Sequence, residues 1–220
     1  LEDILKPVNS DYQCISFRAG GFYAQPSTDL ITAMKDVGLQ IDSSVVPGYR
    51  TNTPFAVDFT TAPTDKGYWW TTADDITTPG QSGQNIIELP VRAIIKPYWN
   101  NFKPTKLLTT IKRRKMESSA NPARSKKPAG ASTPSLVTVA KKFFAKHAHT
   151  FDLCKLSASD MIKRAEKCRE NSVEPVTVIG HSKDFFNDNN FNSFLAGINS
   201  QHQYSFNTIS RFAQRISSDS

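Results

Sequence analysis

Short apolar runs recur along the chain and are separated by polar turns and amphipathic segments. Five of them have the length and composition of β-strands. They lie at residues 13–17, 40–45, 85–91, 150–154 and 175–179. The last run, PVTVI, is almost entirely β-branched, which is typical of a strand buried on both faces. The pattern therefore predicts a sheet whose strands are largely covered.

Helical periodicity fills the intervals between these runs. Ser27 can cap a helix whose apolar residues share one face until Gly38 ends it. Ser157 and Asp160 have the spacing of a capping box at the start of another helix. The same periodicity predicts helices at residues 105–115, from residue 135 to His147, at residues 190–199 and at residues 207–216.

The order of these elements gives the fold class. Strands alternate with helices, which favours an α/β fold with a parallel sheet or barrel. In such folds the loops after the carboxyl ends of the strands converge on one mouth, where chemistry gathers. Residues 46–84 form a long segment rich in Thr, Pro and Gly with several aromatic residues. A loop of this length inside a domain is often functional.

Two predicted strands end on a side chain with useful chemistry. Run 13–17 leads directly into Arg18, and run 175–179 leads through Gly180 into His181. In a parallel sheet both side chains would reach the same mouth. Arg18 would hold a carboxylate or an oxyanion there, and His181 would carry a proton near neutral pH. Alternatively, Arg18 forms a surface ion pair and His181 bonds a nearby carbonyl group.

The charge of the chain is concentrated in one segment. The 220 residues carry a net charge of +7, from 27 Lys and Arg against 20 Asp and Glu. Residues 112–127 contain seven basic side chains and one acidic one. Aromatic residues do not interleave with them, as a platform for stacking bases would require. We interpret the segment as a solvated linker, and no nucleic-acid partner is expected.

Several motifs along the chain resemble one known family. They are FRAGGF (17–22), VGLQIDSSVVPG (37–48), a YWW loop, IIELPV (86–91), FDLC (151–154) and VIGHSKDF (178–185). Together they resemble the polysaccharide deacetylases of the NodB-homology type, and within them a bacterial subgroup whose arginine motif reads F-R-A-G-G. The resemblance runs from about residue 13 to the end of the closing helix.

The resemblance implies metal-dependent hydrolysis of an N-acetyl group on a sugar polymer or glycoconjugate. By its match to the family motifs, His181 would protonate the departing amine and Arg18 would orient the base aspartate. Val178 and Ile179 would help to line the pocket for the acetyl methyl group. The residues expected to contact the sugar are Phe22, Trp69 and Trp70, whose aromatic faces pack well on sugar rings. Alternatively, the tryptophans are core or loop-anchoring residues.

The chain departs from the family at the metal site. Family members carry a T-F-D-D-like strand and an H-x-x-x-H pair before the arginine motif, and this sequence has neither there. The segment HTFDLC (149–154) follows the arginine motif, so a metal site at His147, His149 and Asp152 is disfavoured. Its three cysteines lack the spacing of a metal finger. The divalent metal, usually zinc in this family, is therefore expected to bind in a longer parent protein.

These observations predict that residues 1–220 form the C-terminal part of a single deacetylase catalytic domain. Its fold would be an irregular (β/α) barrel that lacks the first strands, with a basic, flexible insertion at about residues 112–134. Two other classes stay open: a catalytically inactive relative that binds glycans, and a basic nucleic-acid-binding domain. The upstream sequence would separate the first alternative from the enzyme, and salt-dependent DNA binding would support the second.

Overall fold

A computed structural model describes residues 2–97, 146–181, 184–185 and 188–218. The chain divides into two compact units. One contains Leu1–Ile94 with Ala148–Ser220, and the other contains Ile95–His147. The predicted helix at residues 105–115 and the basic insertion at about 112–134 lie outside the described residues.

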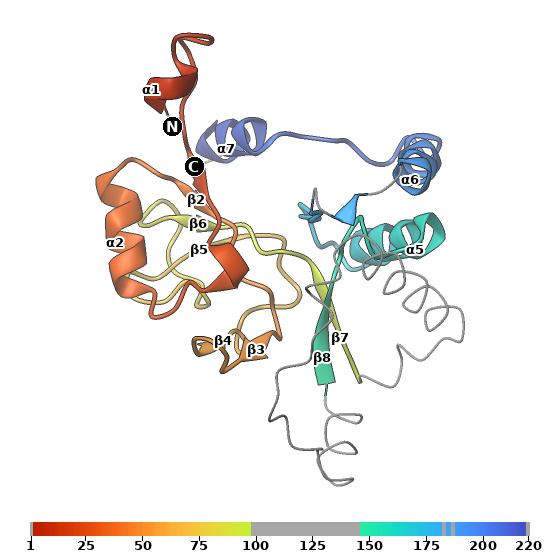
Figure 1. Ribbon diagram of the computed structural model, residues 1–220, viewed down its shortest axis with the longest axis horizontal. Coiled ribbons are helices and arrows are strands. Elements are labelled where there is room, and N and C mark those ends of the chain that lie inside the picture. The colour runs from red at the N-terminus through yellow and green to blue at the C-terminus, as the bar shows by residue number, and fades with distance from the viewer. Residues whose placement is uncertain (1, 98–145, 182–183, 186–187, 219–220) are drawn as a thin grey trace, which may run out of the picture. The chain divides into compact units, whose positions relative to one another are not determined.

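The first unit is organised by a four-stranded sheet (Figure 1). Its strands, in spatial order, are β1 (Ser16–Phe17), β2 (Ile41–Asp42), β6 (Ile87–Glu88) and β5 (Trp69–Trp70). The first three are parallel, and β5 pairs with β6 in the antiparallel direction. Three of the predicted strands are therefore confirmed in place, although each regular part is only two residues long.

The two faces of this sheet are covered by different helices. On one face, α7 (Ile209–Ser218) packs its buried Phe212, Ala213 and Ile216 against Ile41 and Ile87. On the other face, α2 (Thr28–Asp36) contributes Ile31 and Met34 to the largest core cluster. Gly38 ends α2 with a positive φ of 77°, as the sequence predicted.

Two further segments extend the parallel arrangement as isolated bridges. Val91, beyond β6, pairs with Thr177, and Asp152 pairs with Ile179, in both cases in the parallel direction. The predicted strands at 150–154 and 175–179 thus appear as short extended segments. Thr177–Ile179 lies beside both the chain after β6 and the chain around Asp152.

Helices α5 (Ala158–Glu170) and α6 (Asn189–Asn199) pack against each other (Figure 1). The predicted cap of α5 is confirmed, because the Ser157 hydroxyl accepts a hydrogen bond of 3.2 Å from the Asp160 backbone N–H. Gly197 permits the close approach of the helices, since a Cβ there would lie 2.4 Å from the end of the Ile162 side chain. Together they support Phe151, which precedes Asp152 and is buried in the same cluster.

The long segment at residues 46–84 is an integral part of the fold. Besides β5 it contains the hairpin of β3 (Arg50–Thr51) and β4 (Val57–Asp58), and it buries Phe59 and Ile76 completely. Buried apolar side chains fix this segment in place. Outside it, the chain begins with α1 (Glu2–Leu5), and a 3-10 turn, η1, spans Gly20–Phe22.

One helix prediction is wrong at its end. His147 was predicted to continue the apolar stripe of a helix, but it lies in strand β8 (Lys146–Thr150) and is exposed. Strand β8 pairs with β7 (Ala93–Pro97). Pairing with a partner far away in the sequence decides this conformation, and local periodicity does not report it.

The fold class is therefore mixed α/β with small sheets. Among the residues that the structure describes, the strands do not close into a barrel. None of the described helices has the length and apolar content needed to cross a membrane.

Candidate functional site

Arg18 is held by the loop that follows the neighbouring strand. Its Nε donates a hydrogen bond of 2.8 Å to the Ser43 carbonyl, and its Nη2 donates one of 2.7 Å to the Ser43 hydroxyl. Ser43 is buried, and its hydroxyl in turn donates to the Leu89 carbonyl at 2.7 Å. The chain of bonds links the ends of β1, β2 and β6. It fixes the inner side of the guanidinium group, while the Arg18 residue as a whole stays exposed.

The small residue after Arg18 also bonds to the loop that follows β2. Ala19 is buried, and its backbone N–H donates a hydrogen bond of 2.8 Å to the Ser44 hydroxyl. The chain then turns through Gly21 and Phe22, which have positive φ values of 64° and 65°. Glycine adopts this conformation readily, whereas Phe22 is held in it. The small residues therefore allow the turn that brings the strand end against residues 43–44.

The charges of two buried acidic side chains act on Arg18. Asp42 ends β2 and Glu88 ends β6, and the two are register partners in the parallel sheet. Both have an exposed fraction of 0 %. The charges of both carboxyl groups act on Arg18, although burial is the larger influence and lowers the pKa of its guanidinium group. The sheet thus brings a cation close enough to a buried acidic pair for their charges to interact.

Burial shifts the protonation of both acids. It raises the pKa of Asp42, although hydrogen bonds from Glu88 and Ser44 oppose the shift. It raises the pKa of Glu88 well above its ordinary value, and the negative charge of Asp42 raises it further. The charge of Arg18 and a hydrogen bond from the Val45 backbone N–H, at 3.0 Å, only partly offset this shift.

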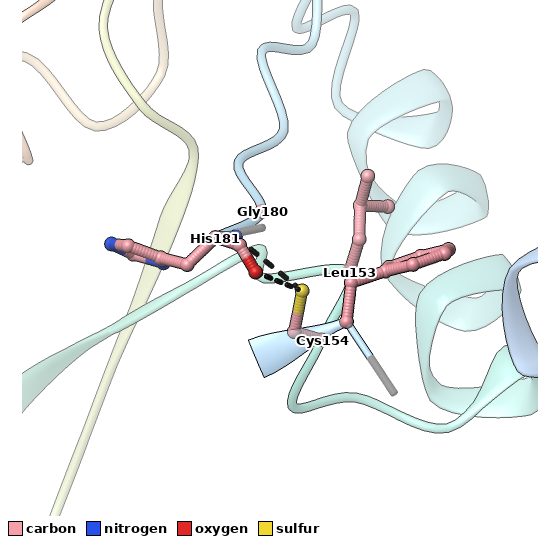
Figure 2. A pocket seen from close by; sticks show the side chains of 5 residues that line it. Leu153, Cys154, Gly180 and His181 are labelled. Atoms are coloured by element: carbon pink, nitrogen blue, oxygen red, sulfur yellow. Dashed lines mark hydrogen bonds between the residues drawn. The ribbon is translucent and has the colours of Figure 1, made fainter. Parts of the chain in front are cut away.

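His181 lies beside a small and mainly apolar pocket. The pocket has a volume of about 330 Å³ and is lined by Leu153, Cys154, Gly180, His181 and Phe185. The imidazole ring extends away from Cys154 and Leu153 (Figure 2). His181 is exposed, so its ring is accessible to solvent and to a ligand.

The backbone of His181 is held by a thiol. The His181 N–H donates to Cys154 Sγ at 3.4 Å, and the thiol lies 3.5 Å from the His181 carbonyl oxygen, to which it can donate (Figure 2). Hydrogen bonds to sulfur are weak, so the thiol holds this backbone less firmly than Ser43 holds Arg18. The His181 carbonyl also accepts a hydrogen bond of 2.8 Å from the Asp184 N–H. A Cβ added at Gly180 would make ordinary contacts with Cys154 and Leu153.

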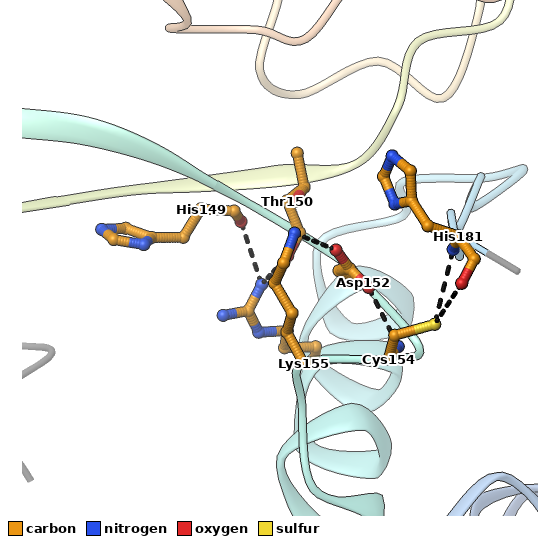
Figure 3. A network of polar contacts seen from close by, with 7 residues as sticks. His149, Thr150, Asp152, Cys154, Lys155 and His181 are labelled. Atoms are coloured by element: carbon orange, nitrogen blue, oxygen red, sulfur yellow. Dashed lines mark hydrogen bonds and ion pairs between the residues drawn. The ribbon is translucent and has the colours of Figure 1, made fainter. Parts of the chain in front are cut away.

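Asp152 anchors the loop that carries Cys154 (Figure 3). It is buried, and it accepts hydrogen bonds from the Cys154 backbone N–H at 2.9 Å and from Lys155 Nζ at 2.7 Å. Nearby, Arg164 donates to the carbonyl oxygens of His149 and Thr150 at 3.0 and 3.1 Å, and burial lowers the pKa of its guanidinium group. The segment beside His181 is therefore fixed by charged side chains that bond to its backbone.

The two candidate residues follow strand segments that run in the same direction. The register joins Phe17 to Asp42 and Asp42 to Glu88, and further along it joins Val91 to Thr177. Arg18 comes directly after Phe17, which belongs to the first of these pairings. His181 comes four residues after Thr177, which belongs to the pairing further along. Arg18 does not line the pocket beside His181. The prediction that the two side chains open onto one cavity stays a prediction.

The residues predicted to contact substrate are divided among different environments. Trp69 is buried in the main core, which is the cluster that contains Ile31 and Met34. Its Nε1 donates to the Ile76 carbonyl at 2.9 Å, as expected for a tryptophan that serves the packing of the core. Trp70 is half-buried on the opposite face of the sheet. Ile179 is buried in the main core, and Val178 packs beside α5 and α6. Phe22 is half-buried, with its ring edge-to-face on Tyr49 at 6.1 Å.

The described residues do not by themselves fit a metal ion. No group of three or more His, Cys, Asp or Glu side chains comes together within the part of the chain that the structure describes. Asp152 is occupied by Lys155 and the Cys154 backbone, while His147 is exposed on β8.

The Asp42–Glu88 pair was not recognised in the sequence. Each acid stands inside a run that is predicted to form a strand, QIDSSV (40–45) and NIIELPV (85–91). Burying a charged group without a partner is costly, so an acid in such a run signals a polar network. That signal was present, but only the strand register shows that the two acids face each other.

Comparisons with known protein families, curated proteins and solved structures found no match to this chain.

Proposed function

We propose that this chain carries part of the active site of a metal-dependent carbohydrate deacetylase, which hydrolyses the amide bond of an N-acetyl group. The observation that supports it is the position of Arg18 and His181, each after a strand segment of one parallel arrangement. The motif resemblance described above supplies the reaction class. We also propose that the fold belongs to an irregular (β/α) barrel.

Arg18 would act by orienting an anionic group. Its hydrogen bonds to Ser43 fix one side of the guanidinium group, and the rest of the exposed residue can face a ligand. A positioned guanidinium group binds a carboxylate or an oxyanion with two donors in a fixed geometry. In the proposed reaction it would orient the carboxylate that serves as the general base.

His181 would act as the general acid. When the tetrahedral intermediate breaks down, the carbon–nitrogen bond cleaves and the leaving nitrogen must take up a proton. The exposed imidazole can reach a ligand, because its ring extends away from the packed residues behind it (Figure 2). The acetyl group leaves as acetate and the sugar keeps a free amine.

The zinc ion of the resemblance would supply the activated water. Its ligands are not among the described residues, so we assign no step to it on this chain. We expect that these 220 residues alone bind zinc weakly and release no acetate. Turnover of an N-acetylated oligosaccharide by the isolated chain, lost on chelation, would contradict that expectation.

The test is acetate release from N-acetylated oligosaccharides by the gene product that contains these residues, with zinc added. His181→Ala should lower kcat by about a hundredfold or more, in line with the loss of a general acid. His202→Asn is a suitable control, because this exposed histidine has a positive φ of 50°, which asparagine tolerates. Near-normal turnover in His181→Ala would remove His181 from the mechanism, and no acetate release by the unaltered protein would contradict the proposed function.

A further inference from the structure

The carboxyl oxygens of Asp42 and Glu88 form an incomplete set of hydrogen bonds. Asp42 Oδ1 accepts from the Ser44 hydroxyl at 2.7 Å, and Glu88 Oε1 accepts from the Val45 backbone N–H at 3.0 Å. The other two oxygens, Asp42 Oδ2 and Glu88 Oε2, are buried and have no donor within the described part of the chain. A buried acceptor without a donor is unfavourable, so each such atom calls for an explanation.

The missing component is a proton. The two carboxyl groups are on register partners of parallel strands and lie within hydrogen-bonding reach of each other. Two ionised carboxylates in a buried site repel each other, and neither can donate a hydrogen bond. One proton placed between Asp42 Oδ2 and Glu88 Oε2 would satisfy both atoms at once.

The groups around the pair come from four strand ends. Asp42 belongs to β2 and Glu88 to β6, while the charge of Arg18, after β1, acts on both acids. On the remaining side, β5 pairs its uncharged Trp69 with Glu88. Arg18 can balance one negative charge, and a second charge in this buried place would be left without a partner.

We propose that Asp42 and Glu88 share one proton, so that the pair carries a single negative charge that acts on Arg18 and helps to position its guanidinium group. The proton resides mainly on Glu88. Asp42 accepts a hydrogen bond from the Ser44 hydroxyl, and the nearby backbone N–H groups of residues 43 and 44 also act to lower its pKa, so both influences favour its charged form. The use of Arg18 in catalysis rests on the proposed function, whereas the shared proton does not.

Carbon-13 NMR of the side-chain carboxyl groups, on the full chain, tests the shared proton. In the unaltered protein one carboxyl should titrate well above the ordinary range of Asp and Glu. In Glu88→Gln that titration should be lost, because the amide supplies a permanent donor to Asp42 and cannot ionise. Glu170→Gln, which changes an exposed glutamate at the end of α5, is the matched control and should keep it.

Two outcomes would overturn the proposal. All carboxyl groups could titrate in the ordinary acidic range, or the high titration could persist in Glu88→Gln. If Glu88→Gln does not fold, the infrared spectrum of the unaltered protein decides. A C=O band of a protonated carboxylic acid at neutral pH, lost on alkaline titration, is expected, and its absence would overturn the shared proton.

The pH dependence of the free energy of unfolding should also report the ionisation of Glu88. Because the pKa of Glu88 is raised on folding, the folded state holds more protons than the unfolded state above the ordinary glutamate pKa. The free energy of unfolding should therefore fall as the pH rises from that value through the raised one. Glu88→Gln should show a smaller fall over this interval than Glu170→Gln, and equal falls would contradict the proposal.

The positioning role has a separate readout. Above the raised pKa the pair would carry two charges and hold Arg18 more tightly, so its ionisation should add to the alkaline loss of acetate release that a general acid causes by itself. Glu88→Gln should therefore show a shallower alkaline loss than the unaltered protein. A protein that releases no acetate would contradict the proposed function, yet the carboxyl titration would still decide whether the proton is shared. An equal alkaline loss in both proteins would overturn the positioning role alone.

Discussion

The strand ends at Arg18 and at His181 are built in contrasting ways. At Arg18, hydrogen bonds of 2.7 and 2.8 Å join the side chain to a buried serine, and the charges of two buried acids act on it. At His181 the side chain extends away from the packing, and the backbone is held by contacts of 3.4 and 3.5 Å to a thiol and by a hydrogen bond of 2.8 Å from the Asp184 N–H. One end fixes a side chain, and the other fixes a loop and leaves the side chain free to adapt.

This difference matches the two kinds of work that the proposal assigns. A group that orients an anion must be held in place, because a small displacement weakens directional hydrogen bonds. A group that transfers a proton must reach its partner and keep contact with solvent to recover its proton. If substitutions at the two strand ends lowered the free energy of unfolding equally, the ends would not differ in this way.

The largest stability difference is expected between Arg18→Ala and His181→Ala. Arg18→Ala removes two hydrogen bonds with a charged donor and leaves the acidic pair without its cation, so it should lower the free energy of unfolding by about 2 kcal/mol. His181→Ala removes an exposed ring and should change it by less than about 0.5 kcal/mol. Denaturant unfolding followed by circular dichroism measures both. Similar losses in the two variants would show that the ends are built alike.

A smaller difference in stability is expected for the residues that bond to Arg18 and to the His181 backbone. Ser43→Ala removes the hydroxyl that bridges Arg18 and the Leu89 carbonyl, and it should cost about 1.5 kcal/mol. Cys154→Ser keeps a group that can bond the His181 backbone and should cost about 0.5 kcal/mol. The same unfolding experiment applies. A larger loss in Cys154→Ser than in Ser43→Ala would reverse the comparison.

Local signals in the sequence predicted the local structure well. Gly38 ends its helix and Ser157 caps the next, because both effects depend on residues within one helical turn. The positions of β1, β2 and β6 were also predicted, since apolar runs must be buried, whereas β3, β4 and β5 lie in the segment that was predicted as a long loop. The lengths of the strands were not, because regular pairing depends on neighbours far away in the sequence.

Features that depend on strand register, or on the face of a strand at which a side chain lies, were not predicted from the sequence. Trp69 and Trp70 were treated alike, yet consecutive residues of a strand point to opposite faces, and the two rings lie in different clusters. His147 continues the apolar stripe of a predicted helix, but it lies in strand β8, which pairs with β7. Asp42 and Glu88 become a pair only when β2 and β6 lie side by side.

In the proposed mechanism Arg18 and His181 serve one reaction, and a double-mutant cycle on acetate release can show whether they do. The cycle compares kcat/KM for Arg18→Ala, His181→Ala and the double variant of the gene product. Residues that act as a unit are strongly non-additive, so the double variant should lose little more than His181→Ala alone, itself about a hundredfold. If the free-energy losses of the two single variants simply add, the two side chains do not work in one site.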